Sequence, residues 1–326
     1  FSINKESRAP SVQPLPTLGG ILKFGVPKEL SQSEILNIID QFVNAAEVAK
    51  QTGFTGVQLH SAHGYLLSEF LSPNVNQRTD EWGGSIENRS KLLITTIEAI
   101  REKVGSNFPI SIKLNSSDFQ KGGFSHEESI EVAKILNNTS LDLLEISGGT
   151  YENFTALEID SLNLKKAKTI KPQRSTKVRE AYFLKYAEAI KEVISIPLAV
   201  TGGFRSTEGM NHALQSGACD VIGLGRPLCS EPDIVNELIS GEKKSATLYE
   251  NMLEFGPWIL GLNSPISLMR SNNKAAQVYW CYRQILKIAD GNEVDTKLGL
   301  FKAFLDHFRD DSANSKKYKA FWKDLD

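Results

Sequence analysis

Five short apolar runs, each followed by a helical pattern, constrain the fold of this chain more than any other feature of its sequence. The runs begin 24 to 56 residues apart, which leaves room for a helix between each strand and the next. Strands that alternate with helices in this way predict βα units and a parallel sheet. The five expected strands are Val57–Leu59, Ile110–Leu114, Leu141–Ile146, Pro197–Thr201 and Val221–Gly225.

The helical patterns carry start and stop signals of their own. An apolar pattern of helical spacing begins after Ser33, the expected N-cap, and stops at Gly53. Ser85 is expected to cap a helix over 85–104, and Ser125 with Glu128 reads as the capping box of the next helix. These signals agree with the alternation of strands and helices.

Glycine turns follow the last two expected strands, and this position suggests how the chain is organised. In a (β/α)8 TIM barrel a phosphate site commonly lies on the loops after strands seven and eight. On that reading the chain holds strands four to eight of such a barrel and lacks strands one to three. We therefore expect a loop segment at 1–34, a partial TIM-barrel domain at 35–241 and a helical C-terminal extension at 242–326. The polar, lysine-rich segment 150–177 is expected to be an insertion over the barrel mouth.

Composition excludes several classes of protein. The formal net charge of −2 over 326 residues gives no electrostatic case for binding nucleic acid or an anionic membrane. No apolar run reaches membrane-spanning length. The three cysteines show no CxxC spacing, so we expect reduced thiols in a cytoplasmic protein, with Cys219 and Cys229 as small core residues.

Three ring-bearing polar residues follow the first expected strand, namely His60, His63 and Tyr65. Two imidazole N–H groups could hold a carbonyl oxygen and stabilise the enolate that forms when a hydride adds to the conjugated double bond. The Tyr65 phenol could then supply a proton. A zinc site is the less favoured alternative, because no third ligand is obvious nearby, and two purely structural histidines are another.

Lys113 lies in the middle of an expected strand, between apolar neighbours. Burying a lysine there is costly unless its ammonium group meets an anion or an electron-rich acceptor. Beside a flavin ring, its charge would stabilise the reduced form. The alternative is a side chain that extends to solvent.

The glycines of the last two turns could let backbone N–H groups approach a phosphate. Gly202 and Gly203 follow one strand, and Gly225 with Arg226 follows the next. Arg226 would add a charge-assisted contact to a phosphate. Each turn alone could equally be an ordinary tight βα loop.

The stretch HSAHGYLLSEFLSPNVNQRTDEWGGSIENR, residues 60–89, closely resembles the old yellow enzyme family of FMN-dependent NADH:flavin oxidoreductases. The resemblance continues more thinly to about Gly241. It implies a (β/α)8 barrel that binds FMN, takes electrons from NADH or NADPH and reduces activated alkenes such as enones. It implies a small-molecule substrate and no metal, and it leaves a homo-oligomer open.

The resemblance also implies roles for individual residues. The positions matching His60 and His63 bind the electron-withdrawing group of the substrate, and the position matching Tyr65 donates the proton. Lys113 stands where the family usually has arginine, which keeps the charge but loses the bidentate geometry. The two glycine turns would hold the FMN phosphate through Gly202, Gly203, Gly225 and Arg226.

Two alternatives remain open at this stage. One is a truncated, non-catalytic barrel remnant, because the family's flavin contacts on strands one to three have no counterpart here. The other is a barrel lyase or aldolase that binds a phosphorylated substrate in the glycine loops.

Overall fold

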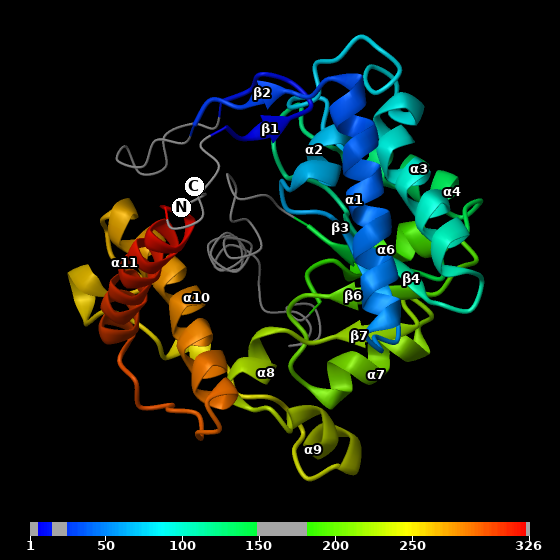
Figure 1. Cartoon of the computed structure of the whole chain (residues 1–326). Helices are drawn as coiled ribbons and strands as arrows, with labels where there is room; N and C mark the ends of the chain where they lie inside the picture. Colours follow the sequence, from blue (N-terminus) through cyan, green and yellow to red (C-terminus); the bar gives the residue numbers. More distant parts are fainter. Residues whose placement is uncertain (1–5, 15–24, 149–180, 324–326) are drawn as a thin grey trace. The chain divides into compact units, whose positions relative to one another are not determined.

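The computed structural model describes residues 6–14, 25–148 and 181–323, and these residues form two compact units (Figure 1). The sheet unit consists of Glu6–Phe204 and Glu208–Gly223. The C-terminal unit consists mainly of Leu224–Asp326 and includes Arg205–Thr207.

A five-stranded parallel sheet organises the sheet unit. Its strands pair in the order in which they occur along the chain, from β3 to β7. All five lie at the places that the apolar runs predicted, so the α/β class with a parallel sheet is confirmed. The strands are β3 (Val57–Ser61), β4 (Ile110–Asn115), β5 (Leu143–Ser147), β6 (Leu198–Thr201) and β7 (Val221–Gly223).

The helices of this unit begin largely where capping chemistry predicted. The Ser85 side chain accepts a hydrogen bond from the Asn88 backbone, and Ser125 with Glu128 forms the expected capping box. The expectation for Ser33 was wrong, because Ser31 is the N-cap and forms a capping box with Glu34. The helices are α1 (Gln32–Gln51), α2 (Leu66–Leu71), α3 (Ile86–Val104), α4 (His126–Leu136), α6 (Leu184–Lys191) and α7 (Thr207–Gln215).

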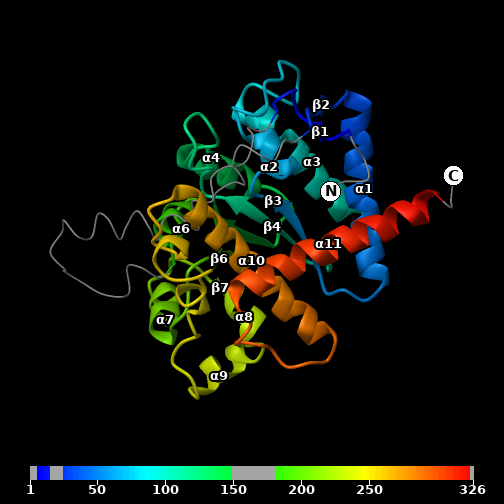
Figure 2. The same cartoon turned by 90° about the vertical axis from the view of Figure 1, so that its left-hand side faces the viewer.

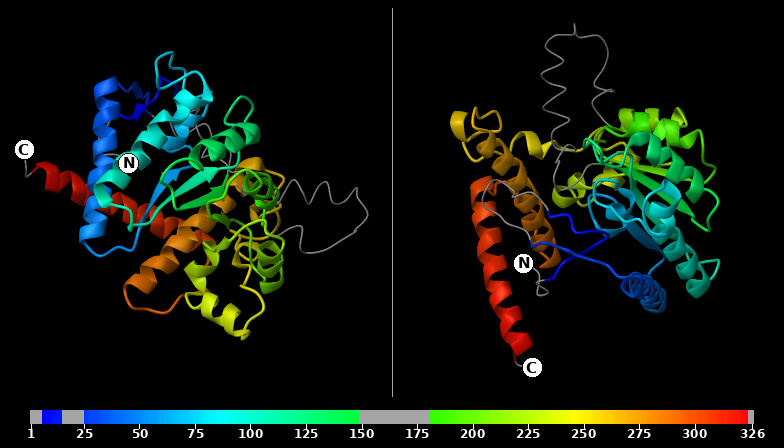
Figure 3. Two further views of the ribbon diagram at one scale, coloured as in Figure 1. Left: turned by 90° about the vertical axis from the view of Figure 1, so that its right-hand side faces the viewer. Right: turned by 90° about the horizontal axis from the view of Figure 1, so that it is seen from above.

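The core of the sheet unit lies between one face of the sheet and the helices that cover it. Helices α1, α3, α4 and α6 follow one another across this face (Figures 1 and 3). Alternate residues of β3 to β6 point into this layer, as the two-residue period of a strand requires. These side chains are at most 4% exposed and include Leu59, Ile112, Leu114, Leu144, Ile146, Leu198 and Val200.

Much of the recognisable stretch 60–89 stabilises the fold. Asn76 donates hydrogen bonds to the carbonyls of Phe70 and Trp82, at 2.8 Å each. The buried Arg78 donates to the carbonyl of Leu30 at 2.7 Å. Arg89 forms an ion pair with Glu128 of α4. These contacts join the loop after α2 to the segment just before α1, and α3 to α4.

The segment 1–34, expected to be loop, contains a two-stranded parallel ribbon among its described residues. The ribbon pairs β1 (Arg8–Ala9) with β2 (Lys28–Glu29). The expected insertion at 150–177 lies outside the described residues.

The C-terminal unit is helical. Its elements are α8 (Arg226–Ser230), α9 (Ile234–Ser240), α10 (Ser267–Ala289) and α11 (Leu300–Lys323), and α10 lies beside α11 (Figures 2 and 3). Trp280 of α10 is 1% exposed and donates its indole N–H to the Leu298 carbonyl at 2.9 Å. Apolar side chains of both long helices also remain exposed, including Tyr282, Leu286, Phe301 and Leu305. No helix among the described residues is both long and apolar enough to cross a membrane.

Candidate functional site

The second face of the five-stranded sheet is polar and carries the candidate site. Parallel pairing aligns His60 of β3 with Lys113 of β4, and Lys113 with Glu145 of β5. Paired residues of neighbouring strands point to the same face, so these three side chains form a row across the sheet. None of the three is fully buried, whereas their sequence neighbours on the opposite face are.

Glu145 is the centre of a hydrogen-bonded network on this face. Its carboxylate accepts from Lys113 Nζ at 2.8 Å, Thr201 Oγ1 at 2.5 Å and Gln58 Nε2 at 2.7 Å. Burial disfavours the charged carboxylate, but the hydrogen bonds from Lys113 and Thr201 outweigh it and lower the pKa of Glu145. Lys113 therefore meets an anion, as its position required, and the alternative of a lysine that extends to solvent is wrong.

The three predicted ring residues lie together at the carboxyl end of β3. The ring centroids of His60 and His63 are 5.1 Å apart, and those of His60 and Tyr65 are 4.8 Å apart. Tyr65 stands immediately before α2 and is 44% exposed. The structure thus brings together the side chains that the sequence placed within one short loop.

His63 is held in an uncommon backbone conformation by neighbouring strands. Its φ of 62° lies in the left-handed region, which costs free energy for a non-glycine residue and often marks a functional site. Its backbone N–H donates to Asn115 Oδ1 at 3.2 Å, and its Nε2 lies 2.8 Å from Ser147 Oγ. Asn115 is fixed in turn by donating to buried Asp118 at 2.9 Å. These contacts fix both the backbone and the ring of His63.

Both imidazoles are neutral near neutral pH. Burial lowers the pKa of His63 to about 4, with a further contribution from His60. Burial and then the charge of Lys113 lower the pKa of His60. A neutral imidazole carries one N–H donor and one acceptor nitrogen. The pair can therefore offer hydrogen bonds to a substrate oxygen without carrying a net charge.

The glycine turn after β6 needs glycine for two reasons. Gly202 and Gly203 have φ values of 136° and 87°, which other residues rarely adopt. A Cβ on Gly202 would lie 2.9 Å from the ring of Phe183, and one on Gly203 would lie 3.0 Å from the ring of Tyr182. The backbone of this turn and the two aromatic rings are thus closely packed.

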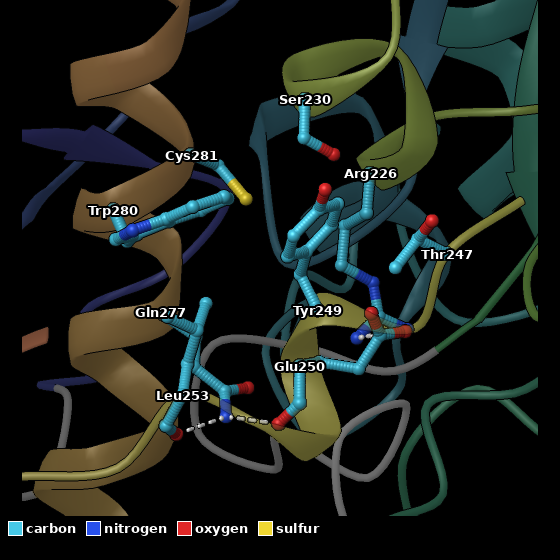
Figure 4. A pocket seen from close by; sticks show the side chains of 9 residues that line it. All are labelled: Arg226, Ser230, Thr247, Tyr249, Glu250, Leu253, Gln277, Trp280 and Cys281. Atoms are coloured by element: carbon cyan, nitrogen blue, oxygen red, sulfur yellow. Dashed lines mark hydrogen bonds and ion pairs between the residues drawn. The ribbon is translucent and has the colours of Figure 1, made fainter. Parts of the chain in front are cut away.

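Gly225 and Arg226 belong to the C-terminal unit. A Cβ on Gly225 would meet open space. Arg226 Nη1 lies 3.5 Å from Glu250 Oε1, and Arg205 Nη2 lies 2.5 Å from the same oxygen. Arg226 and Glu250 line a pocket that also includes Tyr249 and residues of α10 (Figure 4). The phosphate-binding role of Gly225 and Arg226 stays a prediction.

Sequence reasoning missed the residues that position the predicted ones. Glu145, Ser147 and Asn115 contact Lys113 or His63, and Glu250 contacts Arg226. The alternation of Leu144 and Ile146 with Glu145 could have indicated a carboxylate on the same face as Lys113. Among the described residues, no group of three or more His, Cys, Asp or Glu side chains could hold a metal ion.

Fold and site together define an α/β protein with a parallel sheet and a polar, ring-bearing surface at the strand ends. The family model for the NADH:flavin oxidoreductase / NADH oxidase family matches residues 17–245. The chain therefore belongs to this FMN-binding family, as its resemblance to old yellow enzymes predicted.

Named relatives agree with this membership. The chain is 41% identical over 226 residues to an NADH-dependent flavin oxidoreductase, nadA, of Aspergillus parasiticus, and the match covers 69% of this chain and 48% of that protein. It is 37% identical over 239 residues to the NADH-dependent flavin oxidoreductase iliE of Neonectria sp., covering 73% of this chain and 30% of that one. The match thus spans 30% to 48% of the length of these relatives.

Solved structures show the same fold. A 2-naphthoyl-CoA reductase complex matches 79% of this chain and 36% of its own with a TM-score of 0.63 and 27% identity. An old yellow enzyme homologue from Zymomonas mobilis matches 80% of this chain and 68% of its own with a TM-score of 0.57. Its identity of 24% supports the fold alone. The old yellow enzyme neighbours are TIM barrels.

Proposed function

We propose that this chain is the FMN-binding, catalytic part of an NAD(P)H-dependent oxidoreductase that reduces activated alkenes such as enones. The observation that carries the proposal is the cluster of His60, His63 and Tyr65 on the polar face of the sheet, in a chain of this family. Family membership favours this reading over a lyase or aldolase.

The residues of the polar face fit a flavin by the chemistry of their donors. Lys113 and Gln58 each give one N–H to Glu145 and keep further N–H donors on the polar face, a set suited to the carbonyl and nitrogen edge of a planar heterocycle. The glycine turn at Gly202 and Gly203 allows a close approach of backbone to a phosphate. When bound, FMN would supply the redox chemistry, taking a hydride from NADH or NADPH and passing it to the alkene.

His60 and His63 would bind and polarise the carbonyl of the substrate. Because burial keeps both rings neutral, each offers an N–H donor and neither repels the other. The bond network that holds His63 fixes one of these donors before substrate arrives. Preorganised donors stabilise an enolate oxygen more than the starting carbonyl, and this difference accelerates the reaction.

Tyr65 would donate the proton to the α-carbon. Its ring centroid lies 4.8 Å from that of His60, so the phenol would lie near a carbonyl bound by the histidines. At neutral pH a phenol carries its proton and can act as a general acid.

We also propose that the five strands correspond to strands four to eight of a (β/α)8 barrel. The support is the polar face, which has the residue types of a barrel interior at the binding mouth, opposite a face covered by helices. The greater length of the relatives agrees with this assignment.

Two measurements test the function. Purified chain mixed with FMN should retain it through gel filtration and absorb near about 450 nm, as bound flavins do. Tyr65→Phe should slow reduction of an enone about 100-fold while leaving reduction of the flavin by NADH unchanged, because only the proton donor is lost. Tyr186→Phe, on α6 against His126, is the matched control and should change neither step.

A chain that cannot retain FMN would contradict the proposal and favour the barrel remnant. Equal loss of both half-reactions in Tyr65→Phe would contradict the role of Tyr65 alone.

A further inference from the structure

Two cysteines of the C-terminal unit face each other across a helix contact. Cys229 lies on α8 and Cys281 on α10, and these helices pack together. The two thiols are close enough for each to shift the pKa of the other. Cys281 points from α10 into the pocket that Arg226 and Ser230 of α8 also line (Figure 4).

The two thiols have unequal environments. The hydrogen bond from Cys281 and the charge of Arg226 lower the pKa of Cys229 to about 7. The same hydrogen bond and burial raise the pKa of Cys281. Cys229 is partly exposed, so a small oxidant can reach it. A nucleophilic thiolate beside a neutral partner thiol is the arrangement of a peroxide-sensitive cysteine and its resolving cysteine.

Cys219 provides an internal contrast. It lies in the sheet unit, is 2% exposed, and burial raises the pKa of its thiol to about 11. The sequence placed Cys219 and Cys229 in one class of small core residues. The structure confirms this for Cys219 and contradicts it for Cys229, because Cys229 is only partly buried and lies beside a second thiol and a guanidinium.

We propose that Cys229 and Cys281 form a peroxide-sensitive thiol pair, which oxidises to an intramolecular disulfide joining α8 to α10. The proposal concerns residues that the proposed alkene reduction does not use.

The oxidation balances with a hydroperoxide as the oxidant. The Cys229 thiolate attacks the terminal peroxide oxygen, the O–O bond breaks, and the remaining alkoxide or hydroxide leaves and takes up a proton. The product at Cys229 is a sulfenic acid. The Cys281 sulfur then attacks the Cys229 sulfur, the S–O bond breaks, and water leaves with the Cys281 proton. Two thiols thus lose two electrons and reduce one hydroperoxide to an alcohol, or to water when the oxidant is hydrogen peroxide.

The oxidised pair would fix α8, and with it Arg226, against α10. A thiol reductant would reverse the step, because the disulfide exchanges with an external dithiol.

The test treats the full chain with hydrogen peroxide at pH 7 and maps its cysteines by peptide mass spectrometry. We expect a peptide pair cross-linked through Cys229 and Cys281 that dithiothreitol releases. At early times Cys229 should react roughly 50-fold faster than Cys219. Its thiolate fraction is several thousand-fold larger at this pH, and its lower intrinsic nucleophilicity removes about a hundredfold of that advantage.

Variants separate the two steps. In Cys281→Ser the sulfenic acid at Cys229 should persist and be trapped by dimedone, whereas in Cys229→Ser the Cys281 thiol should stay reduced. Cys219→Ala is the matched control and should leave the cross-link unchanged. If all three thiols of the wild-type chain survive peroxide, or if Cys219 reacts as fast as Cys229, the proposal is wrong. The wild-type mapping decides the question even where a variant fails to fold.

Discussion

The two faces of the five-stranded sheet are built from the same strands, but one packs against helices and the other carries the candidate site. Leu144 and Ile146 of β5 are fully buried beneath helices, while Glu145 between them binds Lys113 on the other face. The period of two residues along a strand separates the groups that hold the fold together from those that perform chemistry. Substitutions on the buried face should therefore mainly lower the stability of the fold, and substitutions on the polar face should mainly alter the site.

The largest effect is expected from truncating a residue of the buried face. Leu144→Ala should lower the free energy of unfolding by about 3–5 kcal/mol, because Leu144 is 0% exposed and its loss leaves a cavity. Leu143→Ala, its half-buried neighbour on the polar face, should lower it by only about 1 kcal/mol. Urea denaturation of both variants measures the difference. Similar losses would show that the polar face is packed as tightly as the buried one, which would break the comparison.

A smaller effect on the free energy of unfolding is expected from the protonation of His63, which follows β3. Its folded pKa of about 4 lies below the ordinary value of 6.5, so the unfolded chain binds a proton that the folded chain does not. This histidine therefore stabilises the fold fully above pH 6.5, and that stability is lost as the pH falls towards 4. The loss should be about 2–3 kcal/mol.

The variant His63→Asn isolates this contribution. Glu69 titrates in the same range with the opposite sign, because burial raises its pKa to about 7. The quantity to compare is therefore the stability of the wild type minus that of His63→Asn, measured by urea denaturation at several pH values. A difference that stays constant from pH 7 to pH 4 would show that His63 is not held neutral by burial.

Local chemistry made a large part of the fold predictable from the sequence. Apolar runs located the five strands, and Ser85 and Ser125 located two helix starts, because strand period and capping depend on nearby residues. The helix at Ser31 was placed two residues late, since Ser33 is also a good capping residue. Only the reciprocal contact with Glu34 distinguishes the two.

The candidate site was predictable only within one segment of chain. His60, His63 and Tyr65 were found together because they are close in sequence. The contact between Lys113 and Glu145 was not predicted, because the two residues are on different strands and their contact depends on the register of β4 and β5. The expectation that Cys229 is a small core residue was wrong for the same reason, since its partial exposure depends on how α8 packs on α10.

The smallest of these effects is expected at the Lys113–Glu145 pair, where the polar face itself contributes to stability. Glu145→Gln should lower the free energy of unfolding by about 2 kcal/mol, because it leaves the Lys113 ammonium, 22% exposed, without its carboxylate. Since the folded pKa of Glu145 is lowered, the wild type's advantage is present above the ordinary value of 4.5 and is lost as the pH falls below it.

A double substitution shows whether the cost comes from the unpaired charge. Lys113→Met combined with Glu145→Gln removes both charges. The double variant should recover most of the free energy of unfolding lost in Glu145→Gln, because an apolar side chain replaces the unpaired ammonium. Gln58→Ala, which removes an exposed donor to the same carboxylate, should stay within about 0.5 kcal/mol of the wild type. If the double variant were as unstable as Glu145→Gln, the cost would come from the lost hydrogen bond of Thr201 instead. The polar face would then depend on its hydroxyl and amide groups rather than on its ion pair.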